Sequence, residues 1–324
     1  MRNGYKSPHK IREFVEVACG ILRGSLGARR HLVPSPRWKD AVLCEKSQSR
    51  GADIVPLFDD VLPFRKGLLA MLKVYLDFGK KSDATDGIVC VASVVFKRTP
   101  YKQFLRPWNR MLKAWGASAF HATDFYPGAQ EFVRDTPQRK QLFAEDAKRI
   151  PSMIGDHVQR ILMVSFRPDE FNQLAPPKWK AKFGTSVHSH AVQLTVISNG
   201  WWRHEKCRHE SFAYFMETGD TDQGEVVKTV ERMRAENETS KVIRIASFTP
   251  VDKGMARGLE AADFAAWHWN KHYMDKIRTG KHTDPRKDFA ALEAAAPHKI
   301  DILFATGDKL KYFFSVVPPE ILEA

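Results

Sequence analysis

The sequence predicts an α/β protein in which a mixed β-sheet is flanked by helices. Two observations indicate this fold class. After residue 70, short segments rich in Val, Ile, Phe and Tyr alternate with segments of helical period. The first two strand segments follow each other without a helix between them, whereas helices separate the later ones. A hairpin followed by alternating helices and strands is typical of a sheet with both antiparallel and parallel neighbours.

Each expected element is a segment whose composition and period agree. Strands are expected at residues 72–77, 87–96, 157–166, 211–217 and 242–248. Helices are expected at residues 100–115, 137–150, 186–206, 222–238, 257–278 and 286–296. Thr136 followed by Pro137 is a helix start, and Gly280 is a helix stop.

Residues 1–70 differ in composition from the rest of the chain. They are rich in Arg, Ser, Gly and Pro and contain one short helical pattern, near 10–24. A strand pattern begins directly after Met71. We therefore expect a basic, weakly structured N-terminal extension over 1–70 and one domain over 71–324. Two explanations of the extension stay open: translation starts at Met71, or a basic tail helps to bind nucleic acid.

The composition is that of a globular protein with a basic surface. The chain of 324 residues is 43% hydrophobic, which is ample for one large core. Its apolar runs are shorter than the roughly 20 residues of a membrane helix, and no secretory signal is recognisable, so we expect a cytoplasmic protein without a membrane span. The cysteines are widely spaced and are expected to be reduced thiols.

The net charge of +13 makes a polyanion the natural partner, and we expect nucleic acid. Basic and aromatic residues interleave in "RPWNRMLKAWG" and "PPKWKAKFG", a pattern that suits stacking on bases. The alternative is an amphipathic helix with Trp108 and Trp115 on its core side. Glycine-rich dinucleotide and P-loop motifs are absent, which argues against those nucleotide sites.

The helix expected at 257–278 carries a carboxylate where its packing face should be. At about 100° per residue, Asp263 lies between the apolar residues that define the buried side. A buried carboxylate is costly unless it is paired, hydrogen-bonded or bound to a metal, and the local sequence supplies no partner. His268 and His272 are expected on the solvent side of the same helix.

Acidic residues also end two of the expected strands. Asp77 ends the first strand, and Glu217 ends the strand at 211–217, with Asp220 just beyond it. Together with Asp263 they form a set of hard oxygen ligands that suits Mg²⁺ or Mn²⁺. Two such ions about 4 Å apart activate water for phosphodiester hydrolysis. The alternative is that each acid is an ordinary turn residue.

Four motifs in order resemble a known family. They are "YLDFG", "FHATDF", "YFMETGD" and "GLEAADFAAW", and they resemble the uncharacterised bacterial proteins grouped as domain of unknown function 3800. The resemblance spans residues 72–316. It implies a ribonuclease H-like fold, the architecture of retroviral integrases and many metal-dependent nucleases.

The resemblance also implies roles for individual residues. It makes Asp77, Glu217 and Asp263 the acidic triad, adds Asp220 as a further ligand, and puts His121 and Asp124 near the same cleft. The sequence departs from the family in two of these motifs. In the first, Phe78 stands where an acid is common and no Ser precedes Gly79; in the last, Glu260 stands where Gln is usual.

Three hypotheses follow for the function. The first is a metal-dependent phosphodiesterase acting on nucleic acid with Mg²⁺ or Mn²⁺, in which His121 and Asp124 orient each other, water or phosphate. The second is a non-catalytic nucleic-acid-binding module, which Phe78 favours. The third, by family analogy alone, is a partner protein in a bacterial defence or mobile-element system.

Overall fold

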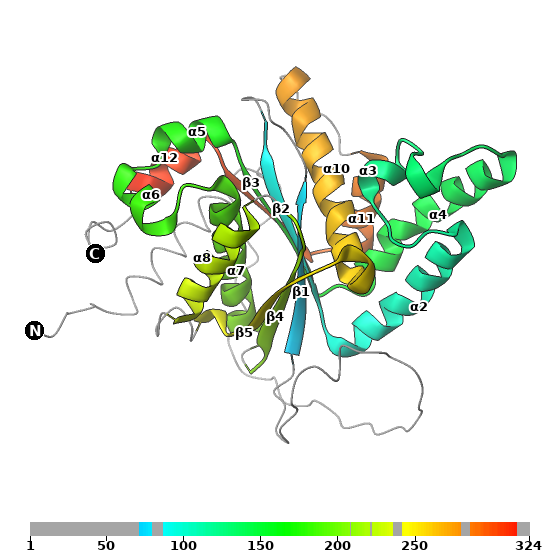
Figure 1. Cartoon of the computed structure of the whole chain (residues 1–324), viewed down its shortest axis with the longest axis horizontal. Coiled ribbons are helices and arrows are strands. Elements are labelled where there is room, and N and C mark those ends of the chain that lie inside the picture. The colour runs from blue at the N-terminus through cyan, green and yellow to red at the C-terminus, as the bar shows by residue number, and fades with distance from the viewer. Residues whose placement is uncertain are drawn as a thin grey trace, which may run out of the picture.

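The protein consists of a six-stranded sheet between two layers of helices (Figure 1). The computed structural model describes residues 71–79, 87–207, 209–220, 222–235, 242–279 and 286–315. The expected N-terminal extension over residues 1–70 and the expected helix stop at Gly280 lie outside these residues. No helix in the described ranges is long and apolar enough to cross a membrane.

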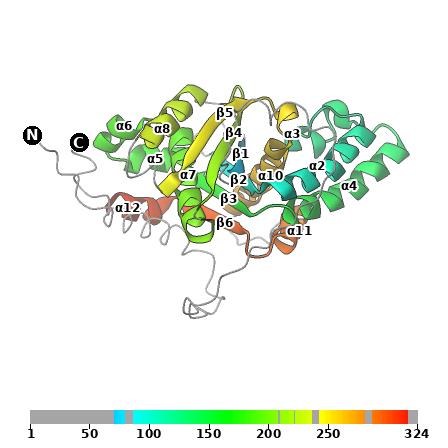
Figure 2. The same cartoon turned by 90° about the horizontal axis from the view of Figure 1, so that it is seen from below.

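The sheet is mixed, as expected. Its strands are β1 (Met71–Gly79), β2 (Val89–Phe96), β3 (Arg160–Phe166), β4 (Ser211–Glu217), β5 (Ile245–Val251) and β6 (Ile300–Ala305). They lie in the order β5-β4-β1-β2-β3-β6, which Figure 2 shows from below. The pairs β1–β2 and β2–β3 are antiparallel, whereas β4 is parallel to β1, β5 to β4 and β6 to β3.

All five expected strands are present, although β5 spans residues 245–251 rather than the expected 242–248, and β6 is a sixth, unexpected strand. β3 starts at Arg160 rather than 157, because the N–H groups of His157 and Val158 bond to the carbonyl of Ile154 in the last turn of the preceding helix. β6 is a short strand at the edge of the sheet, held by its pairing with β3. Its strand conformation therefore depends on a distant partner, which the local pattern does not reveal.

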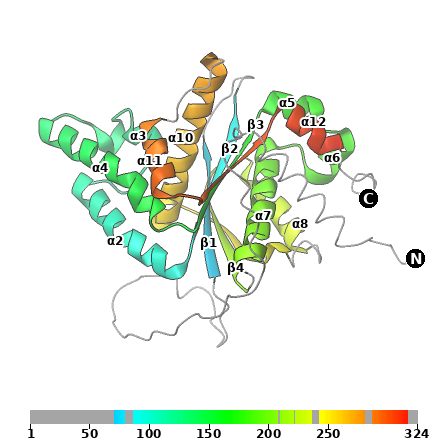
Figure 3. The same cartoon turned by 180° about the vertical axis from the view of Figure 1, so that it is seen from behind.

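The helices form two groups on opposite faces of the sheet (Figures 1 and 3). One group comprises α2 (Arg98–Trp115), α3 (Ala122–Phe125), α4 (Pro137–Gly155), α10 (Arg257–Thr279) and α11 (Lys287–Ala295). The other comprises α5 (Pro168–Leu174), α6 (Pro177–Phe183), α7 (Val187–Lys206), α8 (Gln223–Ala235) and α12 (Gly307–Ser315). Short 3₁₀ turns are η1 (Gln130–Phe132) and η2 (Lys253–Met255).

The six expected helices are confirmed as α2, α4, α7, α8, α10 and α11. The Thr136 hydroxyl accepts a hydrogen bond from the Arg139 N–H at 3.2 Å, so it caps α4 as its position predicts. The helices that we did not expect, α3, α5, α6 and α12, have nine residues or fewer. Segments this short show little more than two turns of the helical period.

Two hydrophobic cores, one on each face, fix the direction of the side chains of β1. Leu76 and Phe78 belong to the core under α7 and α8, whereas Tyr75 belongs to the core under α2 and α10. Successive side chains of a strand point to opposite faces. Asp77 therefore faces α10, and Phe78 faces away from it.

Two glycines let α10 approach β1 closely. A β-carbon at Gly258, in the first turn of α10, would overlap the ring of Tyr75. A β-carbon at Gly79 would lie 3.0 Å from the carbonyl oxygen of Ala266 on α10. Asp263 lies on α10 between these two contacts, so the close approach brings it over the end of β1.

Candidate metal centre

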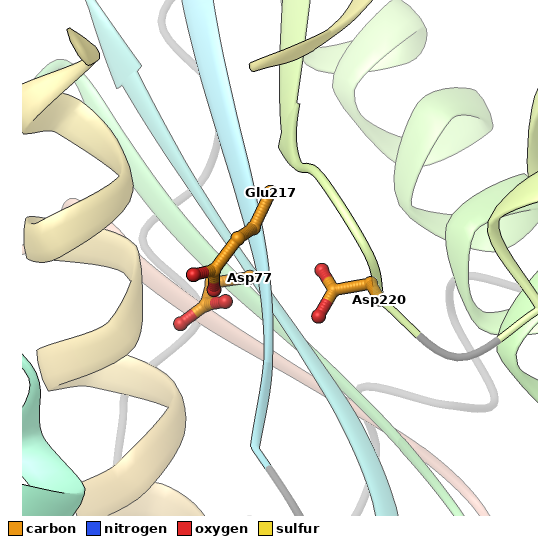
Figure 4. A group of neighbouring side chains, drawn as sticks. All are labelled: Asp77, Glu217 and Asp220. Atoms are coloured by element: carbon orange, nitrogen blue, oxygen red, sulfur yellow. The ribbon is translucent and has the colours of Figure 1, made fainter. Parts of the chain in front are cut away.

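Asp77 and Glu217 are brought together by the parallel pairing of β1 with β4. Leu76 pairs with Met216, and each of these residues is followed directly by its acid. Adjacent parallel strands in register present such residues on the same face of the sheet. Figure 4 shows the two carboxylates side by side. Asp77 is only 2% exposed, and the Glu217 side chain is 21% exposed.

Asp220 reaches the same place from the turn that follows β4. Gly219 adopts φ +83° there, and its N–H donates to Gln223 Oε1 at 2.7 Å, which fixes the turn. Asp220 is buried, and Figure 4 shows its carboxylate directed towards the other two. One oxygen from each of Asp77, Glu217 and Asp220 lies within 4.8 Å of the others. This set of hard oxygen donors fits a metal ion.

A lysine that sequence reasoning missed lies among the same acids. Lys253 Nζ is 2.9 Å from Glu217 Oε2, 3.2 Å from Asp263 Oδ2 and 3.4 Å from Asp77 Oδ2. Its side chain is 6% exposed. Val251, the last residue of β5, pairs with Glu217, and Lys253 follows closely at the start of η2. The sequence pattern placed the strand end at 248, whereas β5 ends at Val251 and so puts Lys253 just beyond a strand end, where functional groups of α/β sheets gather.

The partners of Asp263 are Lys253 and a backbone amide. Asp263 Oδ2 accepts a hydrogen bond from the Ala122 N–H at 3.0 Å, in addition to its contact with Lys253. Ala122 is the first residue of α3, where the N–H has no partner inside the helix. Asp263 does not belong to the group of mutually close carboxylates that Asp77, Glu217 and Asp220 form. The structure thus connects Asp263 to the candidate metal centre through Lys253.

His121 and Asp124 lie beside this contact. His121 directly precedes α3, and its carbonyl accepts hydrogen bonds from the N–H groups of Asp124 at 3.1 Å and Phe125 at 2.8 Å. Both side chains are half-buried. Within the described residues they share no side-chain hydrogen bond, so the two residues interact through the backbone turn. The structure therefore brings "FHATDF" to the acids through Ala122 and not through a His–Asp pair.

The pKa values of Asp77 and Lys253 are both raised in this centre. Burial raises the pKa of Asp77 well above its usual value; Lys253 opposes this shift, and Asp263, Asp220 and Glu217 add to it. Burial alone would lower the pKa of Lys253, but Asp77, Asp263 and Glu217 outweigh burial and raise that pKa above its usual value. Lys253 is therefore a cation, held in place by an excess of carboxylates.

The two residues at which the chain departs from the motifs that it resembles, Phe78 and Glu260, lie outside the acidic cluster. Phe78 belongs to the opposite core, and its ring meets the ring of His188 edge-on, with the centroids 5.1 Å apart. Glu260 is fully buried and accepts hydrogen bonds from Trp108 Nε1 and from Arg257, each at 2.6 Å. Phe78 thus removes no ligand from the centre, and Glu260 ties α10 to α2.

The expectation that His268 and His272 face solvent is wrong. They are 2% and 9% exposed. His268 Nε2 lies 2.6 Å from the hydroxyl of Tyr126. α10 is covered by β1 and β2 on one side and by α3 and α11 on others, so its polar face is buried as well. A single-faced helical period does not reveal such additional neighbours.

Comparisons with known proteins add no family. Neither the profiles of known protein families nor the curated proteins contain a match to this chain. The case for a function rests on the geometry of the metal centre.

Proposed function

We propose that this protein is a metal-dependent nuclease that hydrolyses phosphodiester bonds of nucleic acid with Mg²⁺ or Mn²⁺. The observation that carries the proposal is that one oxygen each of Asp77, Glu217 and Asp220 lies within 4.8 Å of the others, at the ends of two parallel strands and in the turn after β4. Buried carboxylates repel one another and are retained where a cation binds them. Their oxygen chemistry is that of Mg²⁺ and Mn²⁺ sites.

The chain's own residues supply the binding and the orientation. Asp77, Glu217 and Asp220 would hold the ion, which when bound polarises a phosphoryl oxygen and lowers the pKa of water. Lys253 holds Glu217 and Asp263 in position through contacts of 2.9 and 3.2 Å. These contacts preorganise the acids before a substrate arrives.

The arrangement of the motifs supports a ribonuclease H-like fold. Each of the four motifs that resemble domain of unknown function 3800 supplies one part of the centre, namely Asp77, the Ala122 N–H, the pair Glu217 and Asp220, and Asp263. The mixed sheet flanked by helices is what this fold implies. Motifs far apart in the sequence meet at one place, as a shared active site requires.

The proposed substrate is nucleic acid because the exposed side of α2 is basic. α2 contains no acidic residue, and its exposed positions include five basic residues: Arg98, Lys102, Arg106, Arg110 and Lys113. They recur at intervals of three or four residues and so form one stripe along the helix. Together with the net charge of +13, this stripe suits a phosphate backbone.

Cleavage of plasmid DNA and of RNA with Mg²⁺, Mn²⁺ or EDTA tests the proposal. We expect cleavage that requires the ion and falls at least about a hundredfold in Asp77→Asn and Glu217→Gln, because even outer-shell changes cost 10–100-fold at metal sites. Asp252→Asn is the matched control, since Asp252 is exposed and adjacent to Lys253. Absence of metal-dependent cleavage in the parent protein would contradict the proposal.

One observation favours a second candidate, a nucleic-acid-binding module without a metal. Lys253 already contacts three carboxylates, so part of their charge is compensated by the protein itself. This candidate predicts binding of nucleic acid without cleavage and a melting temperature that Mn²⁺ does not change. The nuclease predicts a higher melting temperature in Mn²⁺, because an ion that binds only the folded state stabilises it.

A further inference from the structure

The centre divides into two cation positions that share Asp77 and Glu217. The first position lies between Asp77, Glu217 and Asp220, one oxygen of each being within 4.8 Å of the others. The second lies between Asp77, Glu217 and Asp263, and there the ammonium of Lys253 contacts all three carboxylates. Metal-dependent phosphodiesterases with two ions hold them about 4 Å apart, bridged by shared ligands.

We propose that Lys253 is the permanent second cation of the centre, so that the protein binds one divalent ion per chain and not two. The inference rests on the proposed function, because it specifies how the same site is filled. The single ion takes the position of Asp77, Glu217 and Asp220, and Lys253 keeps the position beside Asp263. Lys253 is thus a positioning residue that sets the number of ions.

Distance and charge keep a second ion out. Lys253 Nζ lies 2.9–3.4 Å from the three carboxylate oxygens, whereas Mg²⁺ requires oxygens at about 2.1 Å in the same space. A divalent ion and an ammonium in one position would also repel strongly in a buried site. The ammonium would therefore have to leave before a second ion could enter.

The backbone holds Lys253 where it is. Val251 is paired with Glu217 in the sheet, and the N–H of Ala256 bonds to the carbonyl of Lys253 at 3.1 Å. The Met255 N–H bonds to the Asp252 carbonyl at 2.9 Å, which closes η2 directly before α10 begins. The lysine is thus fixed between the end of β5 and the start of α10, with its side chain buried.

Titration of the full chain with Mn²⁺ tests the inference without an activity assay. Calorimetry and electron paramagnetic resonance of free Mn²⁺ should both give one ion per chain for the parent. Lys253→Met removes the charge and keeps a side chain of similar length, and we expect two ions, the first bound about tenfold tighter or more because a repelling cation is gone. Lys253→Arg keeps the charge and should bind one ion.

The outcomes separate the inference from the proposed function. Two ions in the parent, or one ion of unchanged affinity in Lys253→Met, would overturn the inference. One ion bound without any nuclease activity would support the inference and contradict the proposed function, whereas no Mn²⁺ binding would overturn both. If Lys253→Met does not fold, Lys253→Gln takes its place, because it also removes the charge and keeps an N–H donor for the carboxylates. The number of ions that the parent binds tests the inference whether or not either variant folds.

Discussion

Asp263 is the residue whose position in the sequence is hardest to explain without the fold. Its Oδ2 atom is contacted by a hydrogen-bond donor, the Ala122 N–H at 3.0 Å, and by a cation, Lys253 Nζ at 3.2 Å. Charge-assisted hydrogen bonds of this kind are stronger than neutral ones and offset the loss of hydration. Asp263 therefore contributes to the fold before any metal binds.

Asp263→Asn should destabilise the metal-free protein. The amide keeps an acceptor for Ala122 but loses its charge towards Lys253, and the free energy of unfolding should fall by about 1–3 kcal/mol. Urea unfolding in EDTA measures this change, with Asp252→Asn as the exposed control. A variant as stable as the parent would mean that relief of repulsion among the acids outweighs the lost contacts.

At the scale of elements, α2 has a buried aromatic side and an exposed basic side. Its inward tryptophans are buried and donate to acids, Trp108 to Glu260 at 2.6 Å and Trp115 to Asp146 at 2.8 Å. This confirms the amphipathic alternative for "RPWNRMLKAWG", so these rings are not available for stacking on bases. In "PPKWKAKFG", Lys180 Nζ donates to the Asn172 carbonyl. The proposed nucleic-acid contacts are therefore the outward basic residues of α2.

Replacing Lys102, Arg106 and Arg110 together with Gln should flatten the salt dependence of nucleic-acid binding. If each of these basic side chains neutralises one phosphate, the slope of log K against log salt concentration should become less steep by about 2–3. Fluorescence anisotropy at several salt concentrations measures the slope.

The matched control for α2 lies on α8, across the sheet. Lys228, Arg232 and Arg234 are exposed there among the acids Glu225 and Glu231, and their replacement with Gln removes the same charge. We expect an unchanged slope for this control. Equal effects of the two sets would show that net charge, and not the stripe on α2, accounts for binding.

At the scale of the whole molecule, a buried histidine should make the fold sensitive to acid. Burial, and to a lesser degree Arg286, lowers the pKa of His268 from 6.5 to about 3. The folded protein keeps this imidazole neutral, whereas the unfolded chain takes up a proton below its ordinary pKa. The contribution to stability is therefore complete above pH 6.5 and is lost as the pH falls towards 3.

His268→Gln should remove this part of the acid response. Gln offers both a donor and an acceptor to the Tyr126 hydroxyl but does not titrate, so the parent should lose about 1.4 kcal/mol per pH unit relative to the variant below pH 6.5. Urea unfolding between pH 7 and pH 4.5 gives the two slopes. His209→Gln, at an exposed position, should leave the parent's slope unchanged.

The sequence by itself determined the fold class and the main elements. Alternating strand and helix periods predict a mixed α/β sheet, and the structure has the five expected strands and six expected helices. Such periods are local properties, since each segment buries one face whichever neighbour covers it. The acids at the ends of β1 and β4 could be named for the same reason, because strand ends in α/β sheets are where ligands bind.

Only the tertiary structure decided which groups meet. Strand order places β5 beside β4 and β4 beside β1, and so brings Lys253 to Asp77 across 176 positions of the chain. The same packing turns Phe78 away from the acids and buries His268 under neighbouring elements. The partner of a buried charge depends on which elements pack together. The hydrophobic period of one segment carries no information about the element that packs against it.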